Sequence, residues 1–233
     1  MADDERPSPQ HVAEFGKGGM PPPTADGHLD APAFHRNHAP ILAVLARLLA
    51  GRGGDVLEIG SGTGQHAVAF CRGLADVTWW PSDHLDGHLR SIAAWREHAK
   101  LGNLRPPARI DASQMDWRLA SRGLPAAFRA MFCANVIHIA PWPVAQGIFA
   151  AAGRHLEAHG RLLLYGPFRR DGVHNSPGNE AFDEGLRRDN PEWGVRDTAD
   201  LKKLAAKSGL RLAELIEMPA NNAMLVFSPR RER

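Results

Sequence analysis

Residues 56–66 of this 233-residue chain read Val-Leu-Glu-Ile-Gly-Ser-Gly-Thr-Gly-Gln-His. A short apolar run, typical of a buried β-strand, leads directly into glycines at positions 60, 62 and 64. Glycines at the end of a strand allow a tight turn and let a ligand approach the backbone closely. In open α/β sheets, ligands bind beyond the carboxyl ends of the strands. The stretch therefore predicts a strand, a ligand-binding loop and a helix from Gln65 to Leu74.

The spacing of the glycines distinguishes between classes of ligand. A phosphate-binding P-loop requires Gly-Lys-Ser/Thr after the turn, whereas this loop continues with Gln65 and His66. A dinucleotide-binding loop has the spacing Gly-x-Gly-x-x-Gly, which would place the third glycine at Gln65. An acidic residue followed by Gly-x-Gly-x-Gly favours S-adenosylmethionine, which carries no phosphate. We expect five residues of this loop to bind that cofactor: Glu58, Gly60, Gly62, Thr63 and Gly64.

Two further carboxylates follow the next strands. Asp83 comes just after the β-rich run Val77–Trp80, and Asp111 ends the weaker strand candidate Arg109–Ile110. A carboxylate at the position of Asp83 can accept the ribose hydroxyls of a nucleoside and would repel a 2′-phosphate. Asp111 is placed to accept a hydrogen bond from the adenine amino group. The alternative for both is that they cap the helix that follows.

Strand and helix patterns alternate along the rest of the chain. The remaining strands are expected at 130–139, 162–165, 210–216 and 223–227, and the remaining helices at 41–49, 85–95, 144–156 and 197–209. The last two strands have no helix between them, so we expect a hairpin there. The sequence therefore predicts an α/β fold: a doubly wound, mostly parallel seven-stranded sheet with an antiparallel C-terminal hairpin.

Residues 1–30 have a different composition from the remainder. They are rich in proline and glycine and show neither a helix nor a strand period. We expect residues 1–30 to be a flexible N-terminal arm, or alternatively a lid over the active site, and residues 31–233 to form a single domain.

Composition limits the possible partners and compartments. The chain has 28 basic and 26 acidic residues, and this net charge of +2 does not suggest a nucleic-acid-binding surface. Cys71 and Cys133 both lie in apolar runs and are too few for a disulfide framework. There is no apolar stretch of about 20 residues and no basic leader. We expect a cytoplasmic protein with no nucleic-acid or membrane partner, and the oligomeric state stays open.

Several strings between Ala33 and Phe227 resemble the class I S-adenosylmethionine-dependent methyltransferases, and within them an uncharacterised bacterial and animal methyltransferase-like family. The resemblance implies a Rossmann-like methyltransferase fold and S-adenosylmethionine as cofactor, and it supplies no acceptor. Gly60 departs from the alanine that is common in the family. The matching strings are Arg36-Asn37, Pro40–Leu42, Leu57–Ile59, Ser61–Ala67, Pro81–Asp83, Ile137–Ile139, Pro141-Trp142, Tyr165–Gly172, Trp193–Asp197 and Met218–Asn222.

The methyl acceptor is expected near the ends of the fourth and fifth strands. The stretch Asn135–His138 resembles the place where related enzymes contact cofactor and substrate, so Asn135 is a cofactor-binding candidate. His138 and Tyr165 are the catalytic candidates. Alternatively, His138 is a structural residue beneath the turn at Pro141. An Asp/Asn-Pro-Pro-Tyr motif is absent from this region, which disfavours amino groups of nucleic acids or protein amides as acceptors.

Seven residues are candidates for substrate binding. Arg169 and Arg170 could clamp a carboxylate or a phosphate, which would indicate an anionic substrate, or they could be surface arginines paired with Asp171. Asn221 could instead form the hairpin turn. His84 and His88 lie four residues apart, but with no third ligand we expect no metal site. The substrate-binding candidates are Arg36, Asn37, Trp142, Arg169, Arg170, His174 and Asn221.

Three functions are compatible with these residues. The first is S-adenosylmethionine-dependent methyl transfer to an oxygen, nitrogen or sulfur atom of a small molecule, by in-line displacement in an enclosed pocket. The second is methylation of a protein, which would need a shallow acidic groove. The third is a non-catalytic protein that only binds the cofactor, because a fold alone does not determine function. The intact glycine loop disfavours the third.

Overall fold

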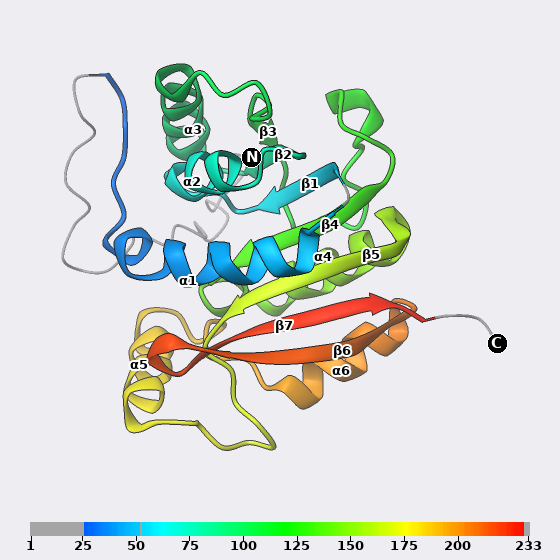
Figure 1. Cartoon of the computed structure of the whole chain (residues 1–233). Coiled ribbons are helices and arrows are strands. Elements are labelled where there is room, and N and C mark those ends of the chain that lie inside the picture. The colour runs from blue at the N-terminus through cyan, green and yellow to red at the C-terminus, as the bar shows by residue number, and fades with distance from the viewer. Residues whose placement is uncertain (1–25, 52, 231–233) are drawn as a thin grey trace, which may run out of the picture.

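A mixed β-sheet with the strand order β3-β2-β1-β4-β5-β7-β6 lies at the centre of the molecule (Figure 1). The computed structural model describes residues 26–51 and 53–230, and within them the sheet has seven strands. β1 to β5 are parallel, and β7 is antiparallel to both of its neighbours. The strands are β1 Gly54–Ile59, β2 Val77–Asp83, β3 Ala108–Arg109, β4 Phe128–Ala134, β5 Leu156–Gly166, β6 Leu210–Met218 and β7 Asn222–Pro229.

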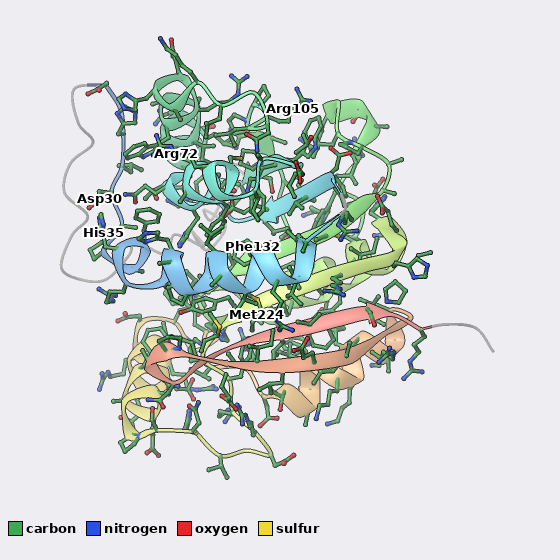
Figure 2. The ribbon with its side chains drawn as sticks, in the orientation of Figure 1. Asp30, His35, Arg72, Arg105, Phe132 and Met224 are labelled. Carbon is green, nitrogen blue, oxygen red and sulfur yellow. The ribbon has the colours of Figure 1, made fainter. Side chains whose placement is uncertain are left out.

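Helices cover both faces of this sheet. Each strand alternates its side chains between the two faces, so the sheet has two separate apolar cores. On one face α1 and α2 pack against residues such as Phe132 and Met224, both labelled in Figure 2. On the other face α4 and α6 pack against residues such as Leu57 and Phe227. The helices are α1 Pro32–Leu49, α2 Gln65–Gly73, α3 Asp86–Ala99, α4 Trp142–His155, α5 Pro177–Asp189 and α6 Thr198–Lys207.

The predicted fold class is confirmed. The helical connections between the parallel strands and the antiparallel β6–β7 pair give the doubly wound arrangement with a C-terminal hairpin. From β1 the chain adds β2 and then β3 toward one edge of the sheet, and it then returns to place β4 on the other side of β1. The strand order therefore reverses between β1 and β4. In open α/β sheets this point of reversal is where ligands bind.

Two predicted strand boundaries are wrong. The fourth strand was expected to reach Ile139, but β4 ends at Ala134 because Asn135 takes a left-handed conformation (φ 61°), and a short 3₁₀ helix, Val136–His138, follows. The second strand does not stop at Pro81 but continues to Asp83. Pro81 lacks an N–H. On this side of β2 the Trp79 amide donates to the Asn103 carbonyl and the Trp79 carbonyl accepts from the Arg105 amide, and β3 begins only at Ala108, so the missing donor of Pro81 lies at a gap in the pairing.

The segment between β5 and α6 also differs from the prediction. It was expected to be irregular, but it contains α5, whose first turn is capped by the Ser176 hydroxyl accepting from the Asn179 amide at 3.2 Å. Only Asp183 and Leu186 of this helix are buried, and its sequence contains few apolar residues. The helix expected at 144–156 ends at His155, because Leu156 already pairs with Phe128 as the first residue of β5.

Residues 26–31 lie against α2 and α3. The Leu29 amide donates to the Ser91 hydroxyl at 2.9 Å, and the Trp95 indole donates to the Leu29 carbonyl at 3.0 Å. The Ala31 amide donates to the Gln65 side chain at 2.8 Å. The predicted arm therefore has an ordered end here, whereas its residues 1–25 lie outside the described residues. No helix in ranges 26–51 and 53–230 is long and apolar enough to cross a membrane.

Candidate active site

The glycine loop follows β1 as predicted, and all three glycines have positive φ angles: 68° at Gly60, 57° at Gly62 and 90° at Gly64. Two of them are also required by packing. A Cβ on Gly60 would lie 2.5 Å from a methyl group of Val136, and one on Gly64 would lie 2.8 Å from the Cα of Ile92. Close packing of the loop against its neighbours therefore demands glycine at 60 and 64, apart from any ligand.

Glu58 supports the loop from within the protein. One carboxylate oxygen accepts hydrogen bonds from the Ser61 hydroxyl and the Trp79 indole, both at 2.9 Å, and the side chain is buried. Burial raises the pKa of Glu58 to about 7, although the two hydrogen bonds act in the opposite direction. Glu58 thus positions the loop and does not line the pocket described below.

Asp83 lies at the end of β2, and its buried carboxylate faces the loop. It accepts from the backbone amides of Gly62 and Leu85, both at 3.0 Å, and from the His88 ring at 3.1 Å. Burial acts to raise the pKa of Asp83, but the hydrogen bonds from His88 and the two amides outweigh it, and the pKa lies below its ordinary value. Asp83 therefore carries a negative charge beside the glycine loop.

A pocket of about 110 Å³ opens at this edge of the sheet. It lies where the strand order reverses, beyond the carboxyl ends of β1, β2 and β4. Of the predicted cofactor-binding residues, the pocket brings together Gly60, Gly62, Asp83 and Asp111. The other residues that line it are Ile59, His84, Leu85, His88, Ile110, Ala112, Val136, Ile139, Ala140 and Val144.

Asp111 lines the pocket and also holds its own turn. Its carboxylate accepts from the Ser113 amide at 2.9 Å, the Ser113 hydroxyl at 2.7 Å and the Gln114 amide group at 3.2 Å. Partial burial acts to raise the pKa of Asp111, but these hydrogen bonds lower it below its ordinary value. Asp111 therefore lies in the pocket wall, and it holds a turn and not the start of a helix, because no helix follows it directly in the described part of the chain.

Thr63 and Gly64 form the end of the glycine loop, before α2. Thr63 connects the loop to residues 29–31 through two side chains. The Thr63 hydroxyl donates to the Gln65 side chain at 3.0 Å, and the Thr63 carbonyl accepts from the Ser91 hydroxyl at 2.7 Å. Gln65 and Ser91 are the side chains that accept the amides of Ala31 and Leu29. The conformation of the loop is thus coupled to the segment that precedes α1.

The two residues after β4 that were predicted to act in the site lie next to each other but outside the pocket lining. The Asn135 amide donates to the Tyr165 carbonyl at 2.8 Å. His138 is buried, and its Nδ1 accepts from the Arg196 amide at 3.3 Å, so the proton of the neutral ring is on Nε2. Burial, with the nearby Arg196 charge, lowers the pKa of His138 to about 3. His138 is therefore neutral in the folded protein at ordinary pH.

Tyr165 and two substrate-binding candidates lie on the face of the sheet that α1 covers. The Tyr165 ring belongs to the core under α1, where burial raises the pKa of its hydroxyl although the charge of Arg36 acts to lower it. The Asn37 side chain is hydrogen-bonded to the His66 ring at 2.7 Å. Arg36 and Asn37 were expected to precede the first helix, but they lie inside α1, which begins at Pro32 and not at Ile41, and they are outside the pocket lining.

The other five substrate-binding candidates are dispersed. Arg170 pairs with Glu217 at 2.6 Å, and His174 contacts the Asp183 carboxylate at 3.2 Å. The Asn221 carbonyl accepts from the side chains of Asn175 and Asn179 at 2.9 Å, which ties the β6–β7 turn to α5. Trp142 and Arg169 line a separate groove. None of the seven lines the pocket that contains Asp83.

Comparison with protein families gives one match. A family model described as DUF938, a protein of unknown function, matches residues 29–229. The chain belongs to this family. The match begins in the segment that contacts α2 and α3 and includes the pocket and every predicted site residue, so all of these are part of the DUF938 domain.

Solved structures with a similar fold include proteins described as methyltransferases. The DUF938 chain matches the mitomycin 7-O-methyltransferase MmcR with a TM-score of 0.70 and 14% identity, covering 85% of this chain and 54% of that one. It matches CalO1, a methyltransferase in calicheamicin biosynthesis in its SAH-bound form, with a TM-score of 0.65 and 19% identity, covering 84% and 54%. It matches NcsB1, an O-methyltransferase from neocarzinostatin biosynthesis in complex with S-adenosylmethionine and 2-hydroxy-5-methyl naphthoic acid, with a TM-score of 0.66 and 17% identity, covering 85% and 55%.

These matches establish the fold of the DUF938 chain as the Rossmann-like fold of class I S-adenosylmethionine-dependent methyltransferases. The chain spans about half the length of the three proteins.

Sequence reasoning missed most of the apolar wall of the pocket. Val136, Ile139, Ala140 and Val144 come from the turn after β4 and the start of α4. The signal was present in the run from 136 to 144, but it was assigned partly to a strand. His84 and His88 were considered only as metal ligands, and they line the pocket beside Asp83 instead.

Proposed function

We propose that this protein binds S-adenosylmethionine and transfers its methyl group to an oxygen, nitrogen or sulfur atom of a small-molecule acceptor. The observation that carries this proposal is the pocket at the reversal of the strand order, with the ionised Asp83 in its wall and the glycine loop beside it. The neighbouring structures support an oxygen acceptor, because MmcR and NcsB1 are described as O-methyltransferases.

The chemistry of the pocket fits this cofactor. Asp83 and Asp111 supply hydrogen-bond acceptors, which ribose hydroxyls and an adenine amino group require. The apolar side chains of Ile110, Val136 and Val144 supply surfaces on which a flat ring can pack. Among the described residues the lining includes no lysine or arginine, and its two carboxylates would repel a ligand phosphate. The pocket therefore favours a nucleoside without phosphate over NAD or ATP.

Asp83 has limited capacity for the ribose. A carboxylate accepts about four hydrogen bonds, and Gly62, Leu85 and His88 already use three of these positions. One ribose hydroxyl can therefore be accepted directly, and the second requires His88 to turn away. The orientation of His88 thus limits how many ribose hydroxyls Asp83 can accept in the proposed complex.

The cofactor, when bound, supplies an electrophilic methyl group, so the protein mainly has to orient the acceptor and exclude water. In this proposal His138 does not act as a base, because its Nδ1 is occupied and its pKa is about 3. Its Nε2–H is buried and has no hydrogen-bond partner in the part of the chain that the structure describes. Because His138, Asn135 and Tyr165 lie outside the lining of this pocket, we assign them the role of supporting the ends of β4 and β5 beside it.

Isothermal titration calorimetry tests cofactor binding. We expect S-adenosylmethionine and S-adenosylhomocysteine to bind, and NAD and ATP not to. Asp83→Asn should weaken the affinity by about 10- to 100-fold, since hydrogen bonds to a charged group contribute about 1.5–3 kcal/mol. The matched control is Asp86→Asn on the same side of the molecule, where the carboxylate is exposed and pairs with Arg109. Unchanged affinity in Asp83→Asn would remove this residue from the site.

Transfer itself is tested with isotopically labelled S-adenosylmethionine. The protein is incubated with a metabolite extract, and mass spectrometry identifies labelled products. A labelled small molecule supports the proposal. Label on protein only would assign a protein methyltransferase, and binding of the cofactor without any product would assign a non-catalytic role.

A further inference from the structure

A groove of about 450 Å³ lies between α4 and α6, and it shares no lining residue with the pocket that contains Asp83. Five cationic side chains line it: Arg169, Arg187, Arg196, Lys203 and Lys207. They come from α5, α6 and the two loops that flank these helices. The rest of the lining is mostly apolar or amide, including Trp142 and Gln146 of α4.

The two carboxylates in the groove do not neutralise these cations. Asp197 uses both oxygens on backbone amides, accepting from Ala199 at 2.7 Å and from Gly172 at 2.6 Å. Asp200 pairs with Lys203 at 2.9 Å on the exposed surface, where such a pair contributes little. An excess of positive charge therefore remains, and the arginines hold most of it.

The three arginines differ in what holds them. Arg196 is fixed by the carbonyls of Ile137, Ala140 and Glu192, and its guanidinium lies 5.6 Å from the centre of the Trp142 ring. The Arg187 Nε donates to Asp183 at 3.1 Å.

Arg169 is the least satisfied. Its Nε is buried and has no hydrogen-bond partner among residues 26–51 and 53–230. Burial and the charges of Arg187 and Arg169 lower the pKa of Arg196, although the charges of Asp183 and Glu192 act in the opposite direction. The cations of the groove outnumber the carboxylates beside them, and an anion bound between them would offset this excess.

We propose that this groove is an anion-binding site for a phosphorylated small molecule, separate from the cofactor pocket. The planar guanidinium group presents paired donors that match phosphate oxygens. Arg169 offers a guanidinium group whose Nε has no partner among the described residues, and Arg187 offers its terminal nitrogens. Arg196 and Trp142 form the adjoining wall. The recessed volume suits a small ligand.

The test is calorimetric titration of the full chain with inorganic phosphate and with pyrophosphate, at constant ionic strength and with S-adenosylhomocysteine present to occupy the other pocket. We expect saturable binding of one anion, tighter for pyrophosphate. Arg169→Gln should weaken it by about tenfold or more, because a charge-assisted bidentate contact is lost. Arg169→Lys, which keeps the charge but not the fork, should give an intermediate affinity.

Arg188→Gln is the matched control, since Arg188 follows Arg187 on α5, is exposed and does not line the groove. Circular dichroism confirms that each variant is folded. The proposal is overturned if no saturable binding occurs, or if Arg188→Gln weakens binding as much as Arg169→Gln. Binding of single-stranded RNA or anionic vesicles without binding of phosphate or pyrophosphate would assign the groove to a macromolecule and also overturn it. The titration requires no methyl transfer, so its result is independent of the proposed function.

Discussion

His138 resists protonation in the folded protein because it is buried beside Arg196, and this has a consequence for stability. Its pKa is about 3 in the folded state, against an ordinary value of 6.5 in the unfolded chain. Between these values the unfolded chain binds a proton that the folded protein does not, so stability falls as the pH decreases. From pH 7.5 to pH 5 we expect His138 to remove about 2 kcal/mol of unfolding free energy.

Glu58 titrates in the opposite sense, because burial raises its pKa to about 7 and stability from this group is lost as the pH rises. The pH dependence of the unfolding free energy of the wild type therefore contains both effects. A variant without His138 is needed to separate them. Urea unfolding of His138→Gln at pH 7.5 and pH 5 should show a smaller loss at pH 5 than the wild type, whereas the exposed control His159→Gln should follow the wild type. A difference between His138→Gln and wild type that is independent of pH would contradict the assignment.

At this scale the sequence predicted which residue types meet at the strand ends but not how each is used. Asp83 and Asp111 were expected in the pocket and lie there. Glu58 was expected to bind the cofactor; its carboxylate accepts from Ser61 and Trp79, and it is outside the pocket lining. The difference arises because successive residues of a strand point to opposite faces, and a loop motif alone does not show that an indole from β2 reaches the same carboxylate.

Among the elements, α6 depends strongly on Asp197, the residue that immediately precedes it. Asp197 caps the helix through the Ala199 amide and also accepts from Gly172, so one carboxylate joins α6 to the loop after β5. Asp197→Ala should reduce the unfolding free energy by about 2 kcal/mol, combining a lost cap with an unsatisfied amide. The measurement is urea unfolding, with Asp200→Ala as control because it lies on the same helix and is half exposed. Equal losses in the two variants would contradict this role.

The same helix was predictable because its signals are local. Asp197 precedes the apolar positions 201 and 204, and Gly209 follows, which is the ordinary order of cap, face and stop. By contrast, α5 was missed because it buries Asp183 rather than an apolar stripe. That aspartate accepts from the Val195 amide at 2.7 Å, a contact between residues distant in sequence that no periodicity reveals.

For the molecule as a whole, residues 26–31, which directly precede α1, are connected to the glycine loop through Gln65 and Ser91. Two truncated chains isolate its contribution: one that begins at Asp26 and one that begins at Pro32, each after an initiating methionine. The shorter chain lacks the hydrogen bonds of Leu29 and Ala31 with Ser91, Trp95 and Gln65. At about 1 kcal/mol for each bond and about 2–4 °C for each kcal/mol, its melting temperature should be several degrees lower.

Its affinity for S-adenosylmethionine should also fall relative to the longer chain, because Ser91 and Gln65 hold Thr63. Differential scanning calorimetry and titration of both chains test this. Identical melting temperatures and affinities would show that the contacts of residues 26–31 do not support the loop.

The architecture was predictable at this scale, whereas the surfaces between elements were not. Alternating strand and helix patterns, with no helix between the last two strands, were sufficient for the seven-stranded sheet and its hairpin. The groove between α4 and α6 combines residues from 142 to 207. Arg169 lines it, whereas its neighbour Arg170 pairs with Glu217 outside it. Such separation follows from the directions of side chains in an irregular segment, which the sequence does not encode in a readable pattern.

The interior position of β7 also has a consequence for how the molecule is made. β7 lies between β5 and β6, although both are synthesised before it (Figure 1). Until residues 222–229 leave the ribosome, β5 has an unpaired edge and β6 has no neighbour to join. A nascent chain at that stage carries exposed backbone donors and acceptors that can pair with other chains. Completion of the sheet therefore requires residues 222–229 to have left the ribosome, and a nascent chain stalled before residue 222 is expected to be prone to aggregate.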